Sequence, residues 1–162
     1  MKVSAVEEYG LRCLRYLSEV HERPGVVTIG EIARAEGVTP EHVAKLVGAL
    51  RRAGLVFSVR GMRGGVRLAR EPGSITVADA LTALSGRPLR SSPCRTGRPT
   101  GGCRNKPDCG IRSVWGVLEA VVTDVLARVT LKDLASGNGI PEACAAGPEK
   151  ATTRPRSGRT AA

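Results

Sequence analysis

The chain has 162 residues, of which 41% are hydrophobic and 2% aromatic, and it carries a formal net charge of +10. This length suits one domain, or one domain with an appendage. No stretch reaches the roughly 18 apolar residues of a membrane span, and the N-terminus lacks the pattern of a signal peptide. We therefore expect a cytoplasmic protein without a membrane partner, whose positive charge favours a polyanion such as nucleic acid.

Residues 5–21 are predicted to form the first helix, because apolar side chains recur there at three- and four-residue steps. The sequence HERPG then ends this helix with Pro24 and Gly25. We interpret Cys13, on the apolar face, as a small buried hydrophobic residue and not as a reactive thiol. The predicted apolar face consists of Val6, Gly10, Cys13, Leu14 and Leu17.

Two short helices with N-terminal caps are predicted next. Thr28 can cap the first, and Glu31, three residues on, can reach back to the N–H of the cap. Thr39 can cap the second, with Pro40 at the first helical position, where a missing N–H costs nothing. Joined by EGVT, the pair has the pattern of a helix-turn-helix. The residues expected to pack are Ile32, Ala33 and Ala35 in the first helix and Val43, Leu46, Val47 and Leu50 in the second.

A β-hairpin is predicted directly after the second of these helices. LVFSVR and VRLAR are short β-rich runs, and the glycines of GMRGG between them suit a tight turn. A hairpin that follows a candidate recognition helix is the outline of a winged helix, and Arg60 and Arg63 flank its tip. We expect these guanidinium groups to enter a narrow minor groove; a solvated turn is the alternative.

A basic, cysteine-rich loop follows a short helix that Thr76 and Asp79 begin and Gly86 ends. Residues 85–112 hold seven Lys or Arg against one Asp, together with three of the five cysteines, and no apolar run that could be buried. In a reducing cytoplasm, clustered cysteines are metal ligands or redox-active thiols more often than structural disulfides.

From residue 111 the helical period returns, with a heptad-like apolar seam along a long helix. A face this broad needs a partner, which we expect to be the same helix of a second subunit; an ordinary core helix is the alternative. TLKDL predicts a short terminal helix capped by Thr130 and Asp133, and the composition beyond it is that of a disordered tail. The seam consists of Ile111, Trp115, Leu118, Val122, Val125 and Val129.

The helix-turn-helix, the segment LVFSVRGMRGGVRLAR, and the three-cysteine loop before a long helix that ends in TLKDL together resemble the Rrf-type family of bacterial transcription regulators, the IscR- and NsrR-like proteins. The resemblance covers about residues 1–135 and implies a homodimeric, mostly α-helical repressor or activator with a small β-hairpin wing. It divides the chain into a winged helix-turn-helix DNA-binding domain (1–86), a cysteine-rich cluster-binding loop (87–110), a dimerisation helix with a short terminal helix (111–136) and a disordered tail (137–162).

The resemblance also implies an iron–sulfur cluster held by Cys94, Cys103 and Cys109, which match the family's three cysteine ligands. The first gap between them, eight residues, is longer than the family commonly has. Arg112 replaces the histidine that is the fourth ligand of IscR-like proteins. Glu8 stands where NsrR-like proteins take a carboxylate from the partner subunit, although an exposed first-turn carboxylate is the alternative. Three thiolates and a carboxylate favour a [4Fe-4S] over a [2Fe-2S] cluster. The cluster would sense nitric oxide, redox state or iron–sulfur supply.

We expect a homodimer to bind a palindromic operator in double-stranded DNA. Glu41 can accept from the amino group of cytosine, and Lys45 can donate to the acceptors of guanine. The predicted DNA-binding residues are Thr28, Thr39, Glu41, His42, Lys45, Arg51, Arg52, Arg60 and Arg63.

Two other functions fit parts of the sequence. One is a cluster-free DNA-binding regulator whose thiols hold zinc or switch by oxidation. The other is an iron–sulfur carrier whose basic surface docks acidic partners. An enzyme is not expected, because His21 and His42 stand in no Ser/His/Asp or Cys/His arrangement, and GMRGG lies in a hairpin and not at a helix start.

Overall fold

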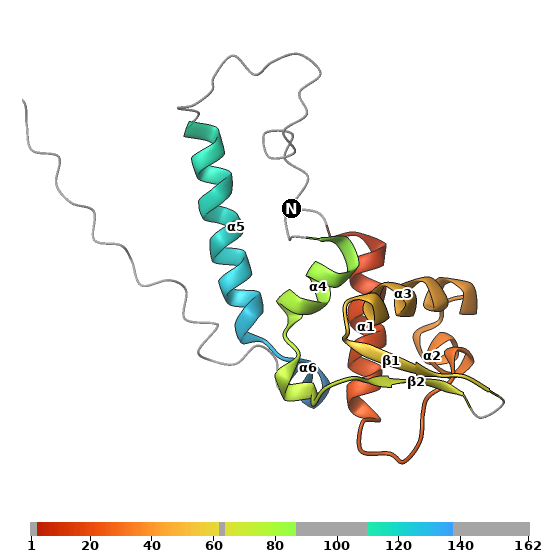
Figure 1. The fold of residues 1–162 in the computed structure, drawn as a ribbon. Coiled ribbons are helices and arrows are strands. Elements are labelled where there is room, and N and C mark those ends of the chain that lie inside the picture. Colours follow the sequence, from red (N-terminus) through yellow and green to blue (C-terminus); the bar gives the residue numbers. More distant parts are fainter. Residues whose placement is uncertain (1–2, 62–63, 87–109, 138–162) are drawn as a thin grey trace, which may run out of the picture.

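The structure, a computed structural model, describes residues 3–61, 64–86 and 110–137 (Figure 1). The three loop cysteines, the wing residue Arg63 and the predicted disordered tail from residue 138 onwards lie outside these ranges. The described part is mostly helical and contains one two-stranded antiparallel hairpin, which confirms the predicted fold class.

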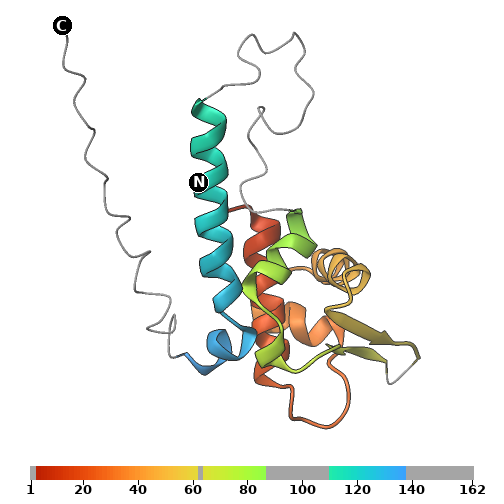
Figure 2. The same cartoon turned by 60° about the vertical axis from the view of Figure 1, so that its left-hand side comes forward.

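The first helix, α1 (Ala5–Glu19), runs through the centre of the described part, with the other elements around it (Figures 1 and 2). Ser4 caps its N-terminus, and Glu7 completes a capping box. The predicted inner face is confirmed at four positions, because the buried residues of α1 are Gly10, Cys13, Leu14 and Leu17.

The helix-turn-helix is formed by α2 (Ile29–Glu36) and α3 (Pro40–Arg52). Both helices begin where the sequence predicts. The Thr28 side chain accepts a hydrogen bond from the N–H of Glu31 in a capping box, and the Thr39 side chain accepts one from the N–H three residues on.

The turn between the two helices and the inner face of α3 also follow the sequence pattern. Gly37, directly after α2, has a φ of +66°, the left-handed conformation in which glycine is favoured. The buried residues of α3 are the predicted ones, Val43, Leu46, Val47 and Leu50.

The inner face of α2 differs from the prediction at one position. Ile32 and Ala33 are buried as predicted, but Ala35 is exposed and the carboxylate of Glu36 is buried in its place. Glu36 faces α1, where Arg12 and another arginine neutralise its charge. Charge compensation from a neighbouring helix therefore decides which residue completes the packing surface of α2.

The predicted wing is a hairpin of β1 (Val56–Val59) and β2 (Gly65–Leu68). Two backbone hydrogen bonds fix it to the segment before α2: Val27 N–H donates to the Val66 carbonyl at 2.9 Å, and Val66 N–H donates to the Val27 carbonyl at 2.7 Å. The hairpin is therefore anchored to the helix-turn-helix by main-chain contacts.

After the hairpin, a 3-10 helix, η1 (Pro72–Ser74), leads into α4 (Val77–Ser85). This helix approaches α1 closely, because the Leu84 side chain occupies the space where a side chain at Gly10 would begin. Val6, one turn before Gly10, is 41% exposed, so its predicted burial was wrong. The physical reason is that the apolar side chain of α4, Leu84, covers α1 at Gly10, whereas α4 meets the turn that carries Val6 with the polar side chain of Ser85.

The last two helices are α5 (Gly110–Arg128) and α6 (Leu131–Ser136). The chain returns to α1 with α6, because Ser18 Oγ donates to the Leu131 carbonyl at 3.2 Å. The Leu131 N–H donates to the Ile75 carbonyl at 2.9 Å, and both side chains are fully buried. The terminal helix is therefore part of the winged-helix core.

The long helix α5 stands beside α4, and the hairpin lies on the other side of α1 (Figures 1 and 2). Val129, which the sequence placed on the seam of this helix, lies just past its end and is buried. No helix within the described ranges is long and apolar enough to cross a membrane. The large hydrophobic side chains that α5 leaves 37% to 65% exposed are Val114, Trp115, Val117, Leu118 and Val121.

Truncation of Leu131 tests whether α6 belongs to the core. Leu131→Ala should lower the free energy of unfolding by about 2–5 kcal/mol, because a fully buried side chain leaves a cavity. Lys132→Ala, at the exposed neighbouring position, should change it by less than about 0.5 kcal/mol. Urea unfolding followed by far-UV circular dichroism measures both, and equally small effects would contradict the assignment.

Candidate nucleic-acid interface

The outward side of α3 lies opposite its buried stripe and is the candidate base-reading surface. Glu41, Lys45 and Arg52 share this side, because they are four and seven residues apart on one helix. Between these charges lie Ala44 and Gly48, whose small size would let the backbone of α3 approach a groove closely. Sequence reasoning missed these two positions, although their spacing opposite the buried stripe was readable.

The predicted threonines stand at the N-termini of the two helices, where they serve as caps. Thr28 Oγ1 donates to Glu31 Oε2 at 2.7 Å and accepts from the Glu31 N–H at 3.2 Å. Hydrogen bonds from Thr28 lower the pKa of Glu31. Thr39 Oγ1 accepts from the His42 N–H at 3.3 Å. Both caps fix where their helices begin, so they place the N–H groups of the first turns at the surface.

The structure places His42 differently from the other predicted DNA-binding residues of α3. Its ring is half-buried and packs edge-on against the ring of Tyr9 in α1. The ring atom Nε2 is inaccessible to solvent and has no hydrogen-bond partner among the described residues. His42 is therefore held against α1 by one side of its ring while it remains only half-buried.

The tip of the wing is built by glycines that no other residue could replace easily. Gly61 has a φ of +114°. A side chain at Gly64 would collide with the carbonyl oxygen of Val59, and one at Gly65 would begin 2.6 Å from the carbonyl oxygen of Val27. These glycines let the backbone segments approach closely enough for a sharp turn. Arg60 is exposed at the tip that results.

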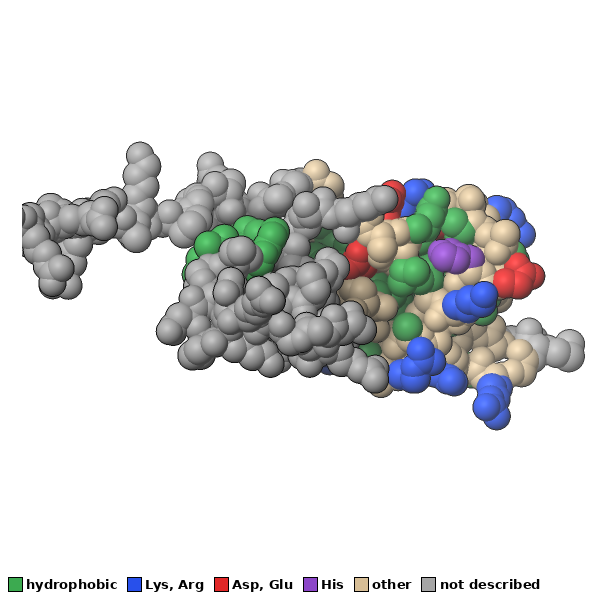
Figure 3. Space-filling model, turned by 90° about the horizontal axis from the view of Figure 1, so that it is seen from above, with side chains coloured by type: hydrophobic (Ala, Val, Ile, Leu, Met, Phe, Trp, Pro, Cys, Tyr) green, Lys and Arg blue, Asp and Glu red, His purple; other side chains and the backbone are tan. Residues whose placement is uncertain are grey.

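Basic side chains are spread over the face of the winged-helix part that Figure 3 shows. Figure 3 shows Lys and Arg side chains spaced around the winged-helix part, with hydrophobic side chains between them and a further hydrophobic group over α5. Within the described ranges, Lys45, Arg51, Arg52 and Arg60 form no ion pair with an acidic side chain. Their charges are therefore available to an anionic partner.

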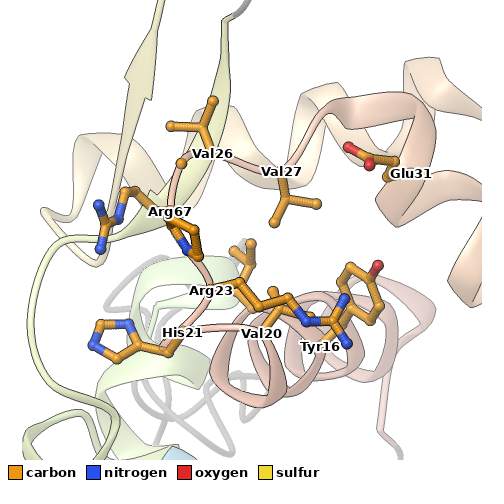
Figure 4. A pocket seen from close by; sticks show the side chains of 11 residues that line it. Tyr16, Val20, His21, Arg23, Val26, Val27, Glu31 and Arg67 are labelled. Atoms are coloured by element: carbon orange, nitrogen blue, oxygen red, sulfur yellow. The ribbon is translucent and has the colours of Figure 1, made fainter.

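A small hollow of about 170 Å³ lies behind the wing, between the end of α1, the start of α2 and β2 (Figure 4). Val27 points towards Tyr16 and Val20 across it, and Arg23 lies alongside Tyr16. Arg67 and His21 lie at its other end. Apolar side chains and separated charged side chains line the hollow, and they do not form a set of polar groups that would bind one particular ligand.

The predicted cluster ligands are described in part. Glu8 is exposed on the first turns of α1, whereas Cys94, Cys103 and Cys109 lie outside the described residues. In the part of the chain that the structure describes, no group of three or more His, Cys, Asp or Glu side chains could hold a metal ion. Cys13 is fully buried, as predicted, and burial raises the pKa of its thiol to about 11, so the thiol stays protonated in the core.

The entrance of the cysteine loop lies next to the start of α1. Ser85, the last residue of α4, donates from Oγ to Glu7 Oε1 at 2.6 Å. This hydrogen bond is the main reason why the pKa of Glu7 is lowered, and the N–H of Ser4 adds to it. Residue 86, where the described segment ends, is therefore close to the turn of α1 that carries Glu8.

Comparisons with known proteins agree with this architecture. The family model Rrf2, described as an iron-dependent transcriptional regulator, matches residues 3–137. The chain is 34% identical over 136 residues to the transcriptional regulator CymR of Bacillus subtilis, covering 84% of this chain and 91% of that protein. It is 28% identical over 142 residues to the transcriptional regulator IscR of Vibrio vulnificus, covering 88% of this chain and 82% of that protein.

Solved structures of the same two kinds of regulator share the fold. The structure of CymR, described as the global cysteine regulator of B. subtilis, matches with a TM-score of 0.65 at 32% identity, covering 84% of this chain and 97% of that one. The T. potens IscR structure matches with a TM-score of 0.64 at 31% identity, covering 84% and 87%. These relatives are transcriptional regulators and not enzymes, as the sequence led us to expect.

A methyl group added at Gly65, where the wing meets the segment before α2, tests its anchoring. Gly65→Ala should lower the free energy of unfolding by about 1–3 kcal/mol, because the new Cβ meets the Val27 backbone, which cannot move without breaking the two hydrogen bonds to Val66. Gly30→Ala in α2, where a Cβ meets nothing within 4 Å, is the matched control and should be neutral or stabilising. Thermal unfolding measures both, and equal stability of the two variants would contradict this account.

Proposed function

Because the chain belongs to the Rrf2 family of transcriptional regulators, we propose that it is a homodimer that binds a palindromic operator under the control of an iron–sulfur cluster in its cysteine loop. The observation that carries the DNA-binding part is the outward side of α3, where accessible cations flank the small residues Ala44 and Gly48. Such a regulator would work in the cytoplasm, where the chromosome is.

In this proposal α3 enters the major groove. Glu41 would accept from a cytosine amino group, and Lys45 would donate to guanine. Phosphates would be bound by Arg51 and Arg52 and by the N–H groups of the helix starts that Thr28 and Thr39 cap. Arg60 and Arg63 of the wing would enter the minor groove, where a narrow groove concentrates negative potential.

The exposed apolar side of α5 supports a homodimer. Trp115 and Leu118 remain 42% and 39% exposed, and Val114 and Val117 on the same helix are 64% and 65% exposed. Apolar side chains at this density on one helix are costly in water, and a second copy of α5 would cover them. Two winged heads related by a two-fold axis would then meet two half-sites of one operator.

The donor set of the cysteine loop suits an iron–sulfur cluster. Cys94, Cys103 and Cys109 would hold it through thiolates, with Glu8 of the partner subunit as the fourth ligand and a [4Fe-4S] cluster favoured. The Glu8 side chain is exposed and makes no hydrogen bond or ion pair within the described ranges, so its carboxylate is available for such a role. When bound, such a cluster would supply a centre sensitive to nitric oxide, oxygen or iron supply.

A second candidate is a cluster-free regulator, and the similarity to CymR favours it. The identity to this relative, 34%, exceeds the 28% shared with IscR, and the two matching structures score almost equally. In that case the loop thiols would bind zinc or respond to oxidants directly. An iron–sulfur carrier, in contrast, does not agree with membership of a family of transcriptional regulators.

Removal of a wing charge tests the DNA-binding surface. Arg60→Ala should weaken operator binding and reduce the slope of log K against log salt by about one, because one cation that neutralises the phosphates beside the minor groove is lost. Arg128→Ala, in an ion pair with Asp124 on α5, should leave the slope unchanged. Fluorescence anisotropy at several salt concentrations measures both variants. An unaltered slope and affinity for Arg60→Ala would contradict the wing assignment.

Substitution of a loop cysteine tests the cluster. After anaerobic reconstitution, the wild type should contain iron and sulfide and absorb visible light, and Cys103→Ser should lose both. Cys144→Ser, outside the loop, is the matched control and should retain them.

Metal analysis separates the two candidate functions. Zinc in place of iron, or no metal at all in a protein that still binds its operator, would reject the cluster and leave the cluster-free regulator. The thermal stability of Cys103→Ser, compared with metal-free wild type, shows whether the substitution disturbs the fold.

A further inference from the structure

The turn of the helix-turn-helix is held on both sides by one face of α1. Glu36 is the last residue of α2, directly before the turn, and His42 lies in the first turn of α3, directly after it. Arg12 of α1 binds Glu36, and Tyr9, three residues earlier on the same face of α1, contacts His42. We call Tyr9, Arg12, Glu36 and His42 the turn clamp.

On the α2 side the contact is between charges. Arg12 Nε donates to Glu36 Oε2 at 2.8 Å, and Arg12 Nη2 donates to the Glu36 carbonyl at 3.4 Å. Arg15 Nη2 lies 3.6 Å from Glu36 Oε1. The Glu36 side chain is 2% exposed and ends a helix, where the helix dipole disfavours a negative charge. Glu36 therefore keeps this place because two guanidinium groups of α1 compensate its charge.

On the α3 side the contact is between rings. The centroids of Tyr9 and His42 are 5.6 Å apart, with an interplanar angle of 87°, which is a favourable edge-to-face arrangement. The guanidinium carbon of Arg12 lies 5.3 Å from the centroid of the Tyr9 ring. Tyr9 and Arg12 also touch each other, so both halves of the turn clamp form one connected group.

The environment of His42 argues against a direct contact with DNA. Its Nε2 atom is buried and has no hydrogen-bond partner within the described ranges. Glu41 and Lys45, its neighbours on α3, are exposed and point to the outward side. The part of His42 that does have a contact is the ring itself, against Tyr9.

We propose that the turn clamp sets the orientation of α3, and that His42 is a positioning residue that determines operator specificity through Tyr9. The proposal rests on DNA binding by α3 and does not depend on the iron–sulfur cluster. A small rotation of α3 about its first turn moves Glu41 and Lys45 away from base edges, whereas attraction to phosphates changes little. The turn clamp therefore controls the preference for the operator over random DNA.

Two substitutions of the same residue separate a positioning role from a direct contact. His42→Phe keeps an aromatic ring against Tyr9 and removes both ring nitrogens, and His42→Ala removes the ring. His42→Ala should lower the ratio of operator affinity to random-DNA affinity by about tenfold, whereas His42→Phe should retain the wild-type ratio. The slope of binding against salt should be unchanged in both, because the phosphate contacts remain.

The DNA probe is a duplex selected by the wild-type protein from a random library, compared with a scrambled duplex of the same length. Arg51→Ala is the control, since loss of a phosphate-directed cation away from the base-reading side should weaken both duplexes and leave their ratio unchanged. Far-UV circular dichroism and thermal unfolding establish that each variant is folded.

Three results would overturn the proposal while leaving DNA binding by α3 intact. Equal loss of the ratio in His42→Phe and His42→Ala would mean that a ring nitrogen contacts DNA. A wild-type ratio in a less stable His42→Ala would mean that the ring only supports the fold. Additive losses when His42→Ala is combined with Tyr9→Leu would mean that the two residues act separately, because a shared contact can be lost only once. A wild-type protein that selects no duplex would reject the proposed function itself, and the positioning role with it.

Discussion

Burial of the inner face of α1 is the interaction on which the rest of the structure depends. Cys13 and Leu14 are fully buried, and α1 contacts α2, α3, α4, α6 and β2. With aromatic residues at 2% of the chain, the aliphatic side chains of one helix supply a packing surface that all these elements share. The wing and α5 can project to opposite sides because the helix between them is held from several directions.

The polar side of the same helix follows from this burial. Once Cys13 and Leu14 face the core, Tyr9 and Arg12 must lie along the edge of the buried face, where the helix-turn-helix docks. Glu8, one residue before Tyr9, is left in solvent. The helix α1 therefore carries core residues, contacts to the helix-turn-helix and the proposed cluster ligand Glu8. A displacement of α1 would move all three groups together.

The elements of the fold were predictable because their signals are local. Thr28 and Thr39 each cap a helix with groups three residues away, and Gly64 at the tip of the hairpin is required by backbone atoms within five residues of it. The prediction that failed in α2 has another origin, because the burial of Glu36 in place of Ala35 depends on a salt bridge to a residue 24 positions away. The packing of His42 likewise depends on the ring of Tyr9 in another helix.

The candidate site was predictable to a similar extent. The exposed cations of α3 follow from its period, whereas the inward place of His42 could not be read from a pattern that gives it the same exposure as its neighbours. The return of α6 to the core depends on Leu131 meeting Ile75, a contact between segments that no local signal connects. The loop cysteines lie outside the described residues, so their role as cluster ligands stays a prediction from the sequence.

The outer edge of β1 has a consequence for how the molecule behaves in concentrated solution. Within the described part of the chain this strand pairs with β2 alone, and Phe57 and Val59, which project from the solvent face of the hairpin beside this edge, are 43% and 44% exposed. An open, apolar strand edge is a template for intermolecular pairing and aggregation. The strand is only four residues long, and the Arg67 guanidinium lies 6.0 Å from the centroid of the Phe57 ring. Shortness and a covering charge thus protect the wing from self-association while its edge stays open.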